Sequence, residues 1–171
     1  IIAKKESDTK EKKQHKDNKT QPRSGTGESR LEKIALHNSK DEMTEFVGVG
    51  KQIKLLIKEK VYQTIKTLIL GYSIKDRLGQ VMYGTNTWHT EQSINAPHTG
   101  EEYLFTIAFP ANLGVGSYSI QTALVDSDTH LTANYEWCDM ALMFNVINTD
   151  KIQFTGCLWN EPTITIEKCT E

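Results

Sequence analysis

The sequence predicts an all-β fold, an antiparallel β-sandwich of eight or nine strands of the immunoglobulin-like or jelly-roll type. Short runs in which apolar and polar residues alternate recur along the chain, with turn-forming residues between them. No segment shows a convincing amphipathic-helix pattern. The chain of 171 residues is also long enough to bury a sizeable core.

The first two expected strands are residues 33–37 and 52–58, in which apolar residues occupy every second position. Residues 51–66 could also be read as a helix. The alternation, and the β-branched residues from Thr64 onward, favour a strand instead.

The clearest local pattern is a β-hairpin over residues 67–87. One face of its first strand carries the apolar side chains Leu68, Leu70, Tyr72 and Ile74. Residues 76–79 are typical of a tight turn, in which Gly79 can take a positive φ angle. A second strand over residues 80–83, and a turn of local hydrogen-bonding side chains over residues 84–87, complete the hairpin.

Four further strands are expected at residues 103–109, 118–124, 140–146 and 163–167. The predicted core of the sandwich consists of Leu68, Leu70, Tyr72, Ile74, Phe105, Ile120, Phe144 and Val146.

Charge divides the chain at residue 24. Residues 1–24 carry eight Lys or Arg and four Asp or Glu, a net charge of +4, and almost no apolar side chains. Such a segment cannot bury enough surface to fold, so it is expected to be a charged linker or tail, the alternative being a basic arm that contacts phosphates. Residues 25–171 form the expected domain, and their net charge of −6 argues against nucleic-acid binding.

Motifs for nucleotides, metals and catalysis are missing. The Gly-rich run at residues 48–51 has Glu45 in place of the first glycine of a P-loop and Gln52 in place of its Ser or Thr. The five histidines, which include His15 and His130, lack ligand spacing, so no metal and no cofactor are expected. Several acidic residues are candidates for a glycosidase pair, but surface acids are the default explanation at this composition: Glu101, Glu102, Asp126, Asp128, Glu136 and Asp139. No catalytic residue is predicted.

The amino-acid sequence of the hairpin is distinctive. Residues 71–79 and 84–87 read Gly-Tyr-Ser-Ile-Lys-Asp-Arg-Leu-Gly and Gly-Thr-Asn-Thr, and they closely resemble a signature of the Wzt C-terminal domain family. Residues 113–120 and 135–146 resemble further segments of the same family, in the same order. One departure is Glu136, which precedes Trp137 where the family usually has Asp. The resemblance covers roughly residues 25–156.

The Wzt resemblance implies a function. Wzt proteins are the ATPase subunits of ABC transporters that export O-antigen polysaccharides. By this resemblance the domain would recognise the non-reducing end of an O-polysaccharide without chemistry and couple recognition to export, in the cytoplasm at the inner membrane. The ATPase would reside in an N-terminal domain outside this chain, beside a transmembrane transporter subunit. The alternative is a sandwich that only dimerises or docks to a protein.

Aromatic and polar residues in the predicted loops are the candidate binding residues. Flat aromatic rings stack on the C–H faces of sugars, while amides, guanidinium groups and imidazoles hydrogen-bond the hydroxyls. The expected carbohydrate-binding residues are Arg77, Asn86, Trp88, His89 and Trp137, with Trp88 as the stacking face and Asn86 and His89 as hydrogen bonders. Turn chemistry explains Arg77 and Asn86 without any ligand, and either tryptophan could instead pack in the sandwich. Arg77 would suit an anionic cap.

A homodimer is expected on two grounds. The family resemblance implies that the domain is presented twice, because ABC ATPases work in pairs. It also implies exchange of a C-terminal strand, for which the β-branched residues 163–167 are suited. The three cysteines contain no CxxC motif and leave an odd thiol, which fits a reducing compartment. No run of residues has the length and apolar character of a membrane span.

Overall fold

The computed structural model describes residues 22–127 and 133–169. Ten strands follow one another in this part of the chain: β1 (Arg23–Ser24), β2 (Ser29–His37), β3 (Phe46–Gly48), β4 (Gln52–Val61), β5 (Thr67–Asp76), β6 (Val81–Asn86), β7 (Ile94–Asn95), β8 (Glu102–Pro110), β9 (Gly116–Val125) and β10 (Asn134–Ile147). No described residue is helical, so the strand prediction for residues 52–58 is confirmed. The expected linker lies mostly outside the described residues, although β1 begins two residues before the expected domain start at Gly25.

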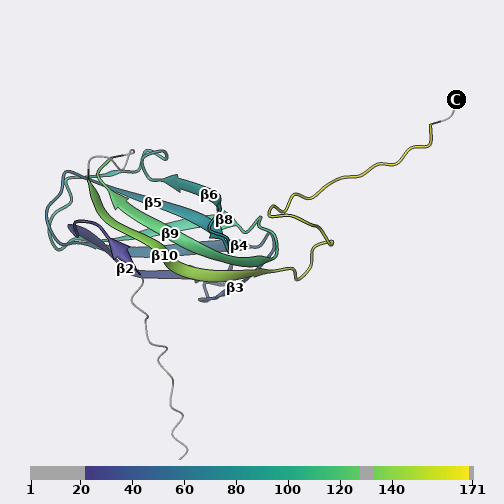
Figure 1. Cartoon of the computed structure of the whole chain (residues 1–171), viewed down its shortest axis with the longest axis horizontal. Coiled ribbons are helices and arrows are strands. Elements are labelled where there is room, and N and C mark those ends of the chain that lie inside the picture. The colour runs from purple at the N-terminus through teal and green to yellow at the C-terminus, as the bar shows by residue number, and fades with distance from the viewer. Residues whose placement is uncertain (1–21, 128–132, 170–171) are drawn as a thin grey trace, which may run out of the picture.

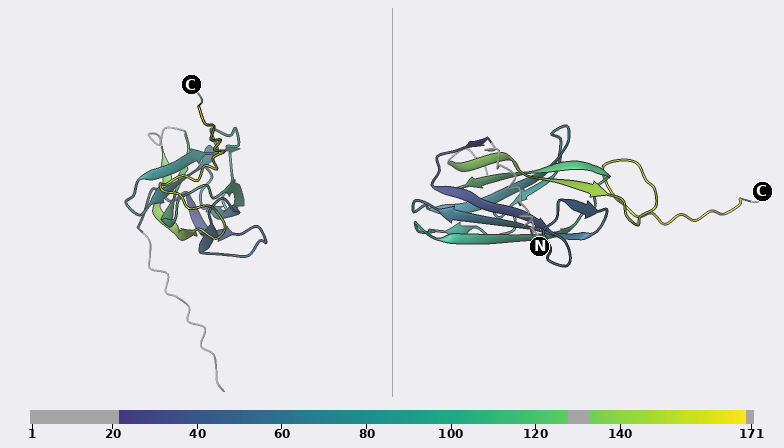
Figure 2. Two further views of the ribbon diagram at one scale, coloured as in Figure 1. Left: turned by 90° about the vertical axis from the view of Figure 1, so that its right-hand side faces the viewer. Right: turned by 90° about the horizontal axis from the view of Figure 1, so that it is seen from below.

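Two sheets pack face to face as a sandwich (Figures 1 and 2). The larger sheet has the order β1-β10-β9-β5-β6, with β3 beside β10 and β7 beside β5, and the smaller sheet has the order β2-β4-β8. Strand pairs are antiparallel except β3 and β10. The predicted sandwich is therefore confirmed. Its strands outnumber the expected eight or nine because β1, β3 and β7 are too short to show an alternating pattern.

The hydrophobic core fills the space between the sheets. Six of the eight predicted core residues are at most 3% exposed: Leu68, Leu70, Ile74, Ile120, Phe144 and Val146. Tyr72 and Phe105 are only half-buried. Both line a hollow of about 510 Å³ at the open edge of the sandwich, between β6 and β8. The core is thus well closed in its middle and open along this edge.

The predicted hairpin forms, with one difference. Asp76 Oδ1 accepts hydrogen bonds from the backbone N–H groups of Leu78 at 2.8 Å and Gln80 at 2.9 Å, and Gly79 has a φ of 80°. The turn expected at residues 84–87 is wrong, because β6 continues through Asn86. Pairing of these residues with β5 supplies the backbone hydrogen bonds that a local turn would have supplied.

Three expectations near the C-terminus are also corrected. Residues 134–137 belong to β10 rather than to a loop. Alternation along the expected strand 140–146, with Phe144 and Val146 in the core, would place Met140 inward. Met140 is 42% exposed instead, because the pairing of β10 with β9 shifts between Cys138 and Leu142. Residues 163–167 form no strand and extend away from the sandwich (Figure 1). A strand needs a neighbour, and a single chain supplies none there.

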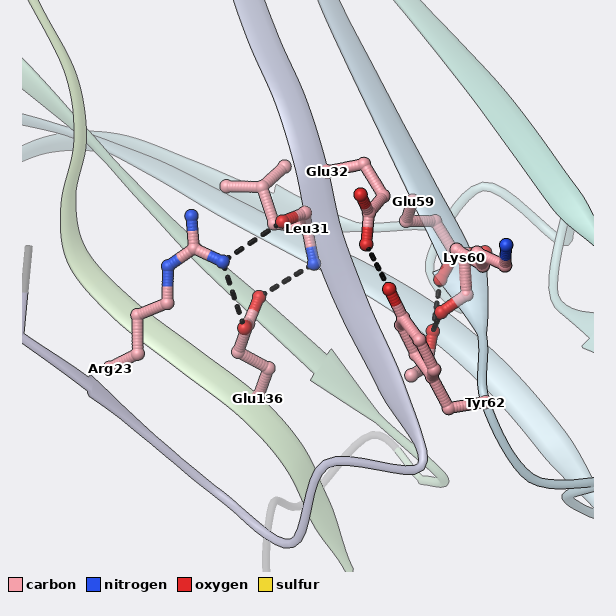
Figure 3. A network of polar contacts seen from close by, with 8 residues as sticks. Arg23, Leu31, Glu32, Glu59, Lys60, Tyr62 and Glu136 are labelled. Carbon is pink, nitrogen blue, oxygen red and sulfur yellow. Dashed lines mark hydrogen bonds and ion pairs between the residues drawn. The ribbon is translucent and has the colours of Figure 1, made fainter. Parts of the chain in front are cut away.

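Buried polar contacts join the two sheets near β1 (Figure 3). Glu136 of β10 accepts a hydrogen bond from the Leu31 N–H of β2 at 2.7 Å. Arg23 Nη1 of β1 donates to the Leu31 carbonyl at 2.9 Å and lies 3.4 Å from Glu136 Oε1. On the smaller sheet, the fully buried Glu59 accepts a hydrogen bond from Ser29. These contacts hold β1 to β2 and β10, and hold β2 to β10 and β4.

Candidate functional site

A groove of about 300 Å³ lies on the outer face of the larger sheet, across β10, β9, β5 and β6. Strand alternation places it there. Leu70 and Ile74 of β5 point into the core, so Gly71 and Ser73 point outward. The pairing of Gly71 with Ala123 carries the same outer face across to β9.

The groove exists because its floor is built of small side chains. Gly71, Ser73 and Gly84 lie on β5 and β6, and Ala123 lies beside Gly71 on β9. A Cβ atom added at Gly71 would meet its nearest neighbours at 3.7–3.8 Å, an ordinary van der Waals distance. The backbone there does not require glycine, so the missing side chain leaves open space rather than relieving strain.

Opposite walls of the groove come from strands far apart in the sequence. Trp137 of β10 forms one wall and packs against the small apolar cluster of Ile69, Ala123 and Val125. Asn86 at the end of β6 and His89 in the following turn form the other wall. Asn86 Oδ1 accepts the backbone N–H of His89 at 2.9 Å, which holds these two residues together.

Uncharged hydrogen-bonding groups lie between the walls. Ser73 Oγ donates to Gln121 Oε1 at 2.9 Å, and Gln121 Nε2 donates to Asp139 Oδ1 at 3.2 Å. Trp137 Nε1 donates to the same Asp139 oxygen at 3.0 Å. Tyr72 also borders the groove; burial, and secondarily the neighbouring Tyr83, raise its pKa to about 12. Its hydroxyl therefore stays protonated.

The arrangement combines a flat aromatic side chain with uncharged donors and acceptors in an open groove. These groups suit a polar ligand with apolar faces. Among the described residues, no three His, Cys, Asp or Glu side chains are placed to hold a metal ion, and no helix is long and apolar enough to cross a membrane. His15 and His130 lie outside the described residues.

Comparison with known families bears on what this groove is for. The family model of the Wzt C-terminal domain matches residues 20–160. The chain belongs to the Wzt C-terminal domain family. Wzt membership makes it a domain associated with ABC transporters. Among curated proteins, none matches the sequence significantly.

A solved structure has the same fold. A crystal structure of the C-terminal domain of Wzt superposes with a TM-score of 0.75 at 18% identity, over 87% of this chain and 90% of that one. A β-glucosidase from Listeria innocua in complex with gluconolactone reaches a TM-score of 0.37 at 8% identity, over 74% of this chain and 16% of that chain. At that score nothing follows for this domain.

Three of the five residues predicted for carbohydrate binding in this Wzt domain come together at the groove: Asn86, His89 and Trp137. Trp88 is 49% exposed in the turn after β6 and does not line the groove. Arg77 is exposed in the tight turn at the tip of the hairpin, also outside the groove lining.

Sequence reasoning missed the floor of the groove. Gln121 and Ser73 occupy ordinary outward positions of strands, where polar residues are the rule. The groove could have been predicted from the outward-facing residues of β5, where Gly71 and Ser73 lie between Ile69 and Lys75. Two consecutive small side chains on an outward face predict a depression.

Glu136, which the sequence resemblance marked as a departure, has a structural role. Its side chain is 7% exposed and reaches the Leu31 N–H on the opposite sheet. The extra methylene of Glu relative to Asp extends that reach. This acid therefore links the two sheets, while its neighbour Trp137 points to the groove.

Proposed function

We propose that this domain is a non-catalytic carbohydrate-binding module that recognises the non-reducing end of an O-antigen polysaccharide. The observation that carries the proposal is the groove on the outer face of a Wzt C-terminal domain, with Trp137 on one wall and Asn86 and His89 on the other. The domain would couple this recognition to export by the ABC transporter.

The chemistry of the groove supports a sugar ligand. Sugar rings present apolar C–H faces that stack on an indole, and hydroxyls that pair with amides. Trp137 is half-buried against apolar neighbours, so part of the ring remains available. The amide groups of Asn86 and Gln121 both line the groove. The groove is open, which suits the end of a long chain that enters from solvent.

Two substitutions test whether the groove binds the glycan: one fills the groove and the other removes the indole. Gly71→Val should fill its floor, because a Cβ atom at this position meets its neighbours at ordinary van der Waals distances and valine favours strands. Trp137→Ala should weaken binding by about 1–3 kcal/mol, by analogy with aromatic stacking on nucleobases. Calorimetry with O-polysaccharide isolated from the source bacterium would measure both.

Trp88→Ala is the matched comparison, since it removes an indole that lies outside the groove. We expect it to weaken binding less than Trp137→Ala. The reverse order would place the glycan on the turn after β6. If the wild-type domain shows no saturable binding, the alternative of a sandwich that contacts only proteins holds instead.

We also propose a homodimer formed by exchange of the C-terminal segment, residues 160–169. Ile164 and Ile166 alternate with threonines and are 77% and 91% exposed. Strand β8 ends the smaller sheet, and the hollow beside it is lined by half-buried apolar side chains. An added strand could pair with this edge and place both isoleucines in the hollow.

Light scattering tests the exchange. Deleting residues 160–171 should convert the dimer at micromolar concentration to monomer or aggregate, because the added strand and its isoleucines are lost. Deleting residues 168–171 alone leaves the alternating run intact and should preserve the dimer. A clean monomer for the full chain would contradict the proposal.

In the full complex we propose a cytoplasmic location, peripheral to the inner membrane. The N-terminal ATPase domain and the transmembrane transporter subunit would be its further partners. This context rests on membership of the Wzt family.

A further inference from the structure

A β-bulge interrupts β10 beside the groove. Cys138 of β10 pairs with Thr122 of β9, and the regular pairing resumes at Leu142 with Ile120. Residues 139–141 therefore stand opposite the single residue Gln121. Bulges of this kind re-aim side chains and often lie next to binding sites. Asp139 is the first residue of the bulge and lies on the outer face of the sheet, where it is hydrogen-bonded to Trp137.

The Asp139 carboxylate holds two parts of the groove at once. Its Oδ1 accepts hydrogen bonds from Trp137 Nε1 at 3.0 Å and Gln121 Nε2 at 3.2 Å. A carboxylate only accepts, so the Gln121 amide must turn its nitrogen toward Asp139 and its oxygen toward Ser73. One residue outside the groove thus fixes the indole wall and the polarity of the floor.

The Asp139 carboxylate places a negative charge directly beside the groove. Among the described residues, those that line the groove include no lysine, arginine, aspartate or glutamate. The nearby cation is Lys75, whose Nζ lies 3.5 Å from Asp139 Oδ1. Asp139 is itself half-exposed. A negatively charged ligand would meet this carboxylate, with the lysine already paired to it.

We infer that Asp139 is a positioning residue that orients Trp137 and Gln121 for an uncharged sugar end and disfavours an anionic one. The inference rests on the proposed carbohydrate-binding function and deepens it. It assigns the class of ligand, a neutral terminal sugar, and the residue that selects it.

Two substitutions separate positioning from charge. Asp139→Asn keeps an oxygen that can accept from Trp137 and Gln121 but removes the charge and releases Lys75. Asp139→Ala removes both. Asp150→Asn is the matched control, because Asp150 is an exposed acid paired with Lys51 and lies outside the groove lining.

The probes are oligosaccharide fragments of the source bacterium's O-polysaccharide, prepared with an uncharged and with a phosphorylated non-reducing end. The wild-type domain should prefer the uncharged end by about tenfold or more, the equivalent of about 1.4 kcal/mol. Asp139→Ala should weaken binding of the uncharged end about tenfold, since hydrogen bonds to charged groups contribute on that scale. Asp139→Asn should keep that binding within about threefold while losing the discrimination against phosphate.

A spectroscopic signal separates positioning from a general structural effect. The chain has three tryptophans, so three indole N–H resonances are expected in a ¹H–¹⁵N spectrum. The Trp137 resonance should shift strongly in Asp139→Ala and on addition of the uncharged probe, while those of Trp88 and Trp159 move less. Asp150→Asn should leave affinity, preference and all three resonances unchanged.

The outcomes are distinguishable. If the phosphorylated end binds as tightly as the uncharged end, or if Asp139→Ala keeps full affinity, the inference is overturned while carbohydrate binding stands. If neither probe binds the wild-type domain, the proposed function itself is overturned. The predicted pattern, with Asp139→Asn and Asp139→Ala behaving differently, supports both.

Discussion

Replacing Phe144 with Ala should cost about 3–5 kcal/mol of unfolding free energy. Phe144 of β10 is 1% exposed and its ring stacks on Tyr118 of β9, with centroids 5.7 Å apart. Truncation removes apolar contacts and leaves a cavity between two sheets that are held apart by their other side chains. The loss is therefore large for a single side chain.

Urea unfolding followed by tryptophan fluorescence measures this cost as a change in midpoint at constant slope. The neighbouring Met143→Ala is the matched control, because Met143 is 55% exposed on the opposite face of the same strand. It should change stability by less than about 1 kcal/mol, as surface substitutions usually do. A loss below about 1 kcal/mol for Phe144→Ala would mean that the register of β10 is different from the one described.

The second large effect is a dependence of stability on pH that originates in Glu59. Burial raises the pKa of Glu59 to about 7, and the nearby Glu136 adds to the rise, while the hydrogen bond from Ser29 lowers it. One carboxyl oxygen of Glu59, Oε1, is buried and has no hydrogen-bond partner. The carboxyl group is therefore better tolerated in this site when it is protonated.

The sign follows from linkage. The folded state holds the Glu59 proton up to about pH 7, whereas the usual pKa is 4.5, so folding takes up a proton between these values. The stability contributed by this group is fully present below about pH 4.5 and is lost as the pH rises to about 7. A difference of this size corresponds to about 3 kcal/mol.

Glu59→Gln should remove this dependence, because the amide resembles the protonated acid in shape and carries no charge. At pH 8 the variant should be more stable than the wild type, and at pH 4.5 the two should be similar. Chemical denaturation across this range, expressed as the difference between variant and wild type, isolates Glu59 from acids such as Asp41 and Glu102, whose pKa values are lowered by lysine partners.

Three charged or titratable groups can modulate the Glu59 effect: Glu136 from β10, its partner Arg23 from β1 and Tyr103 from β8. Glu45→Gln, at an exposed glutamate, is the control. The difference in stability between this variant and the wild type should not change with pH. An equal stability difference between wild type and Glu59→Gln at every pH would contradict a raised pKa.

Much of the fold could be predicted because the relevant information is local. Alternation along β5 identified the buried side chains Leu68, Leu70 and Ile74. Turn chemistry identified the tight turn at residues 76–79, where Asp76 and Gly79 each play a local part. The sequence of the hairpin also identified the Wzt C-terminal domain family, which the family model confirms.

The remaining parts of the fold could not be predicted from the sequence, because long-range strand pairing competes with local preferences. Residues 84–86 have side chains suited to a turn, yet they extend β6 because β5 offers a complete ladder. The bulge at residues 139–141 shifts Met140 outward, and strict alternation predicts the opposite. Residues 163–167 have strand-forming side chains but no neighbouring strand in the single chain.

The sequence by itself determined the strand alternation, the tight turn and the Wzt resemblance, since these depend on neighbouring residues. It also offered Asn86, His89 and Trp137 as candidates. Tertiary structure alone decided that these three share one groove, because β6 and β10 stand on either side of β5 and β9. It likewise decided that Trp137 rather than Trp88 faces the small-residue floor, because the side of the sheet on which a residue lies depends on strand pairing, bulges and turns.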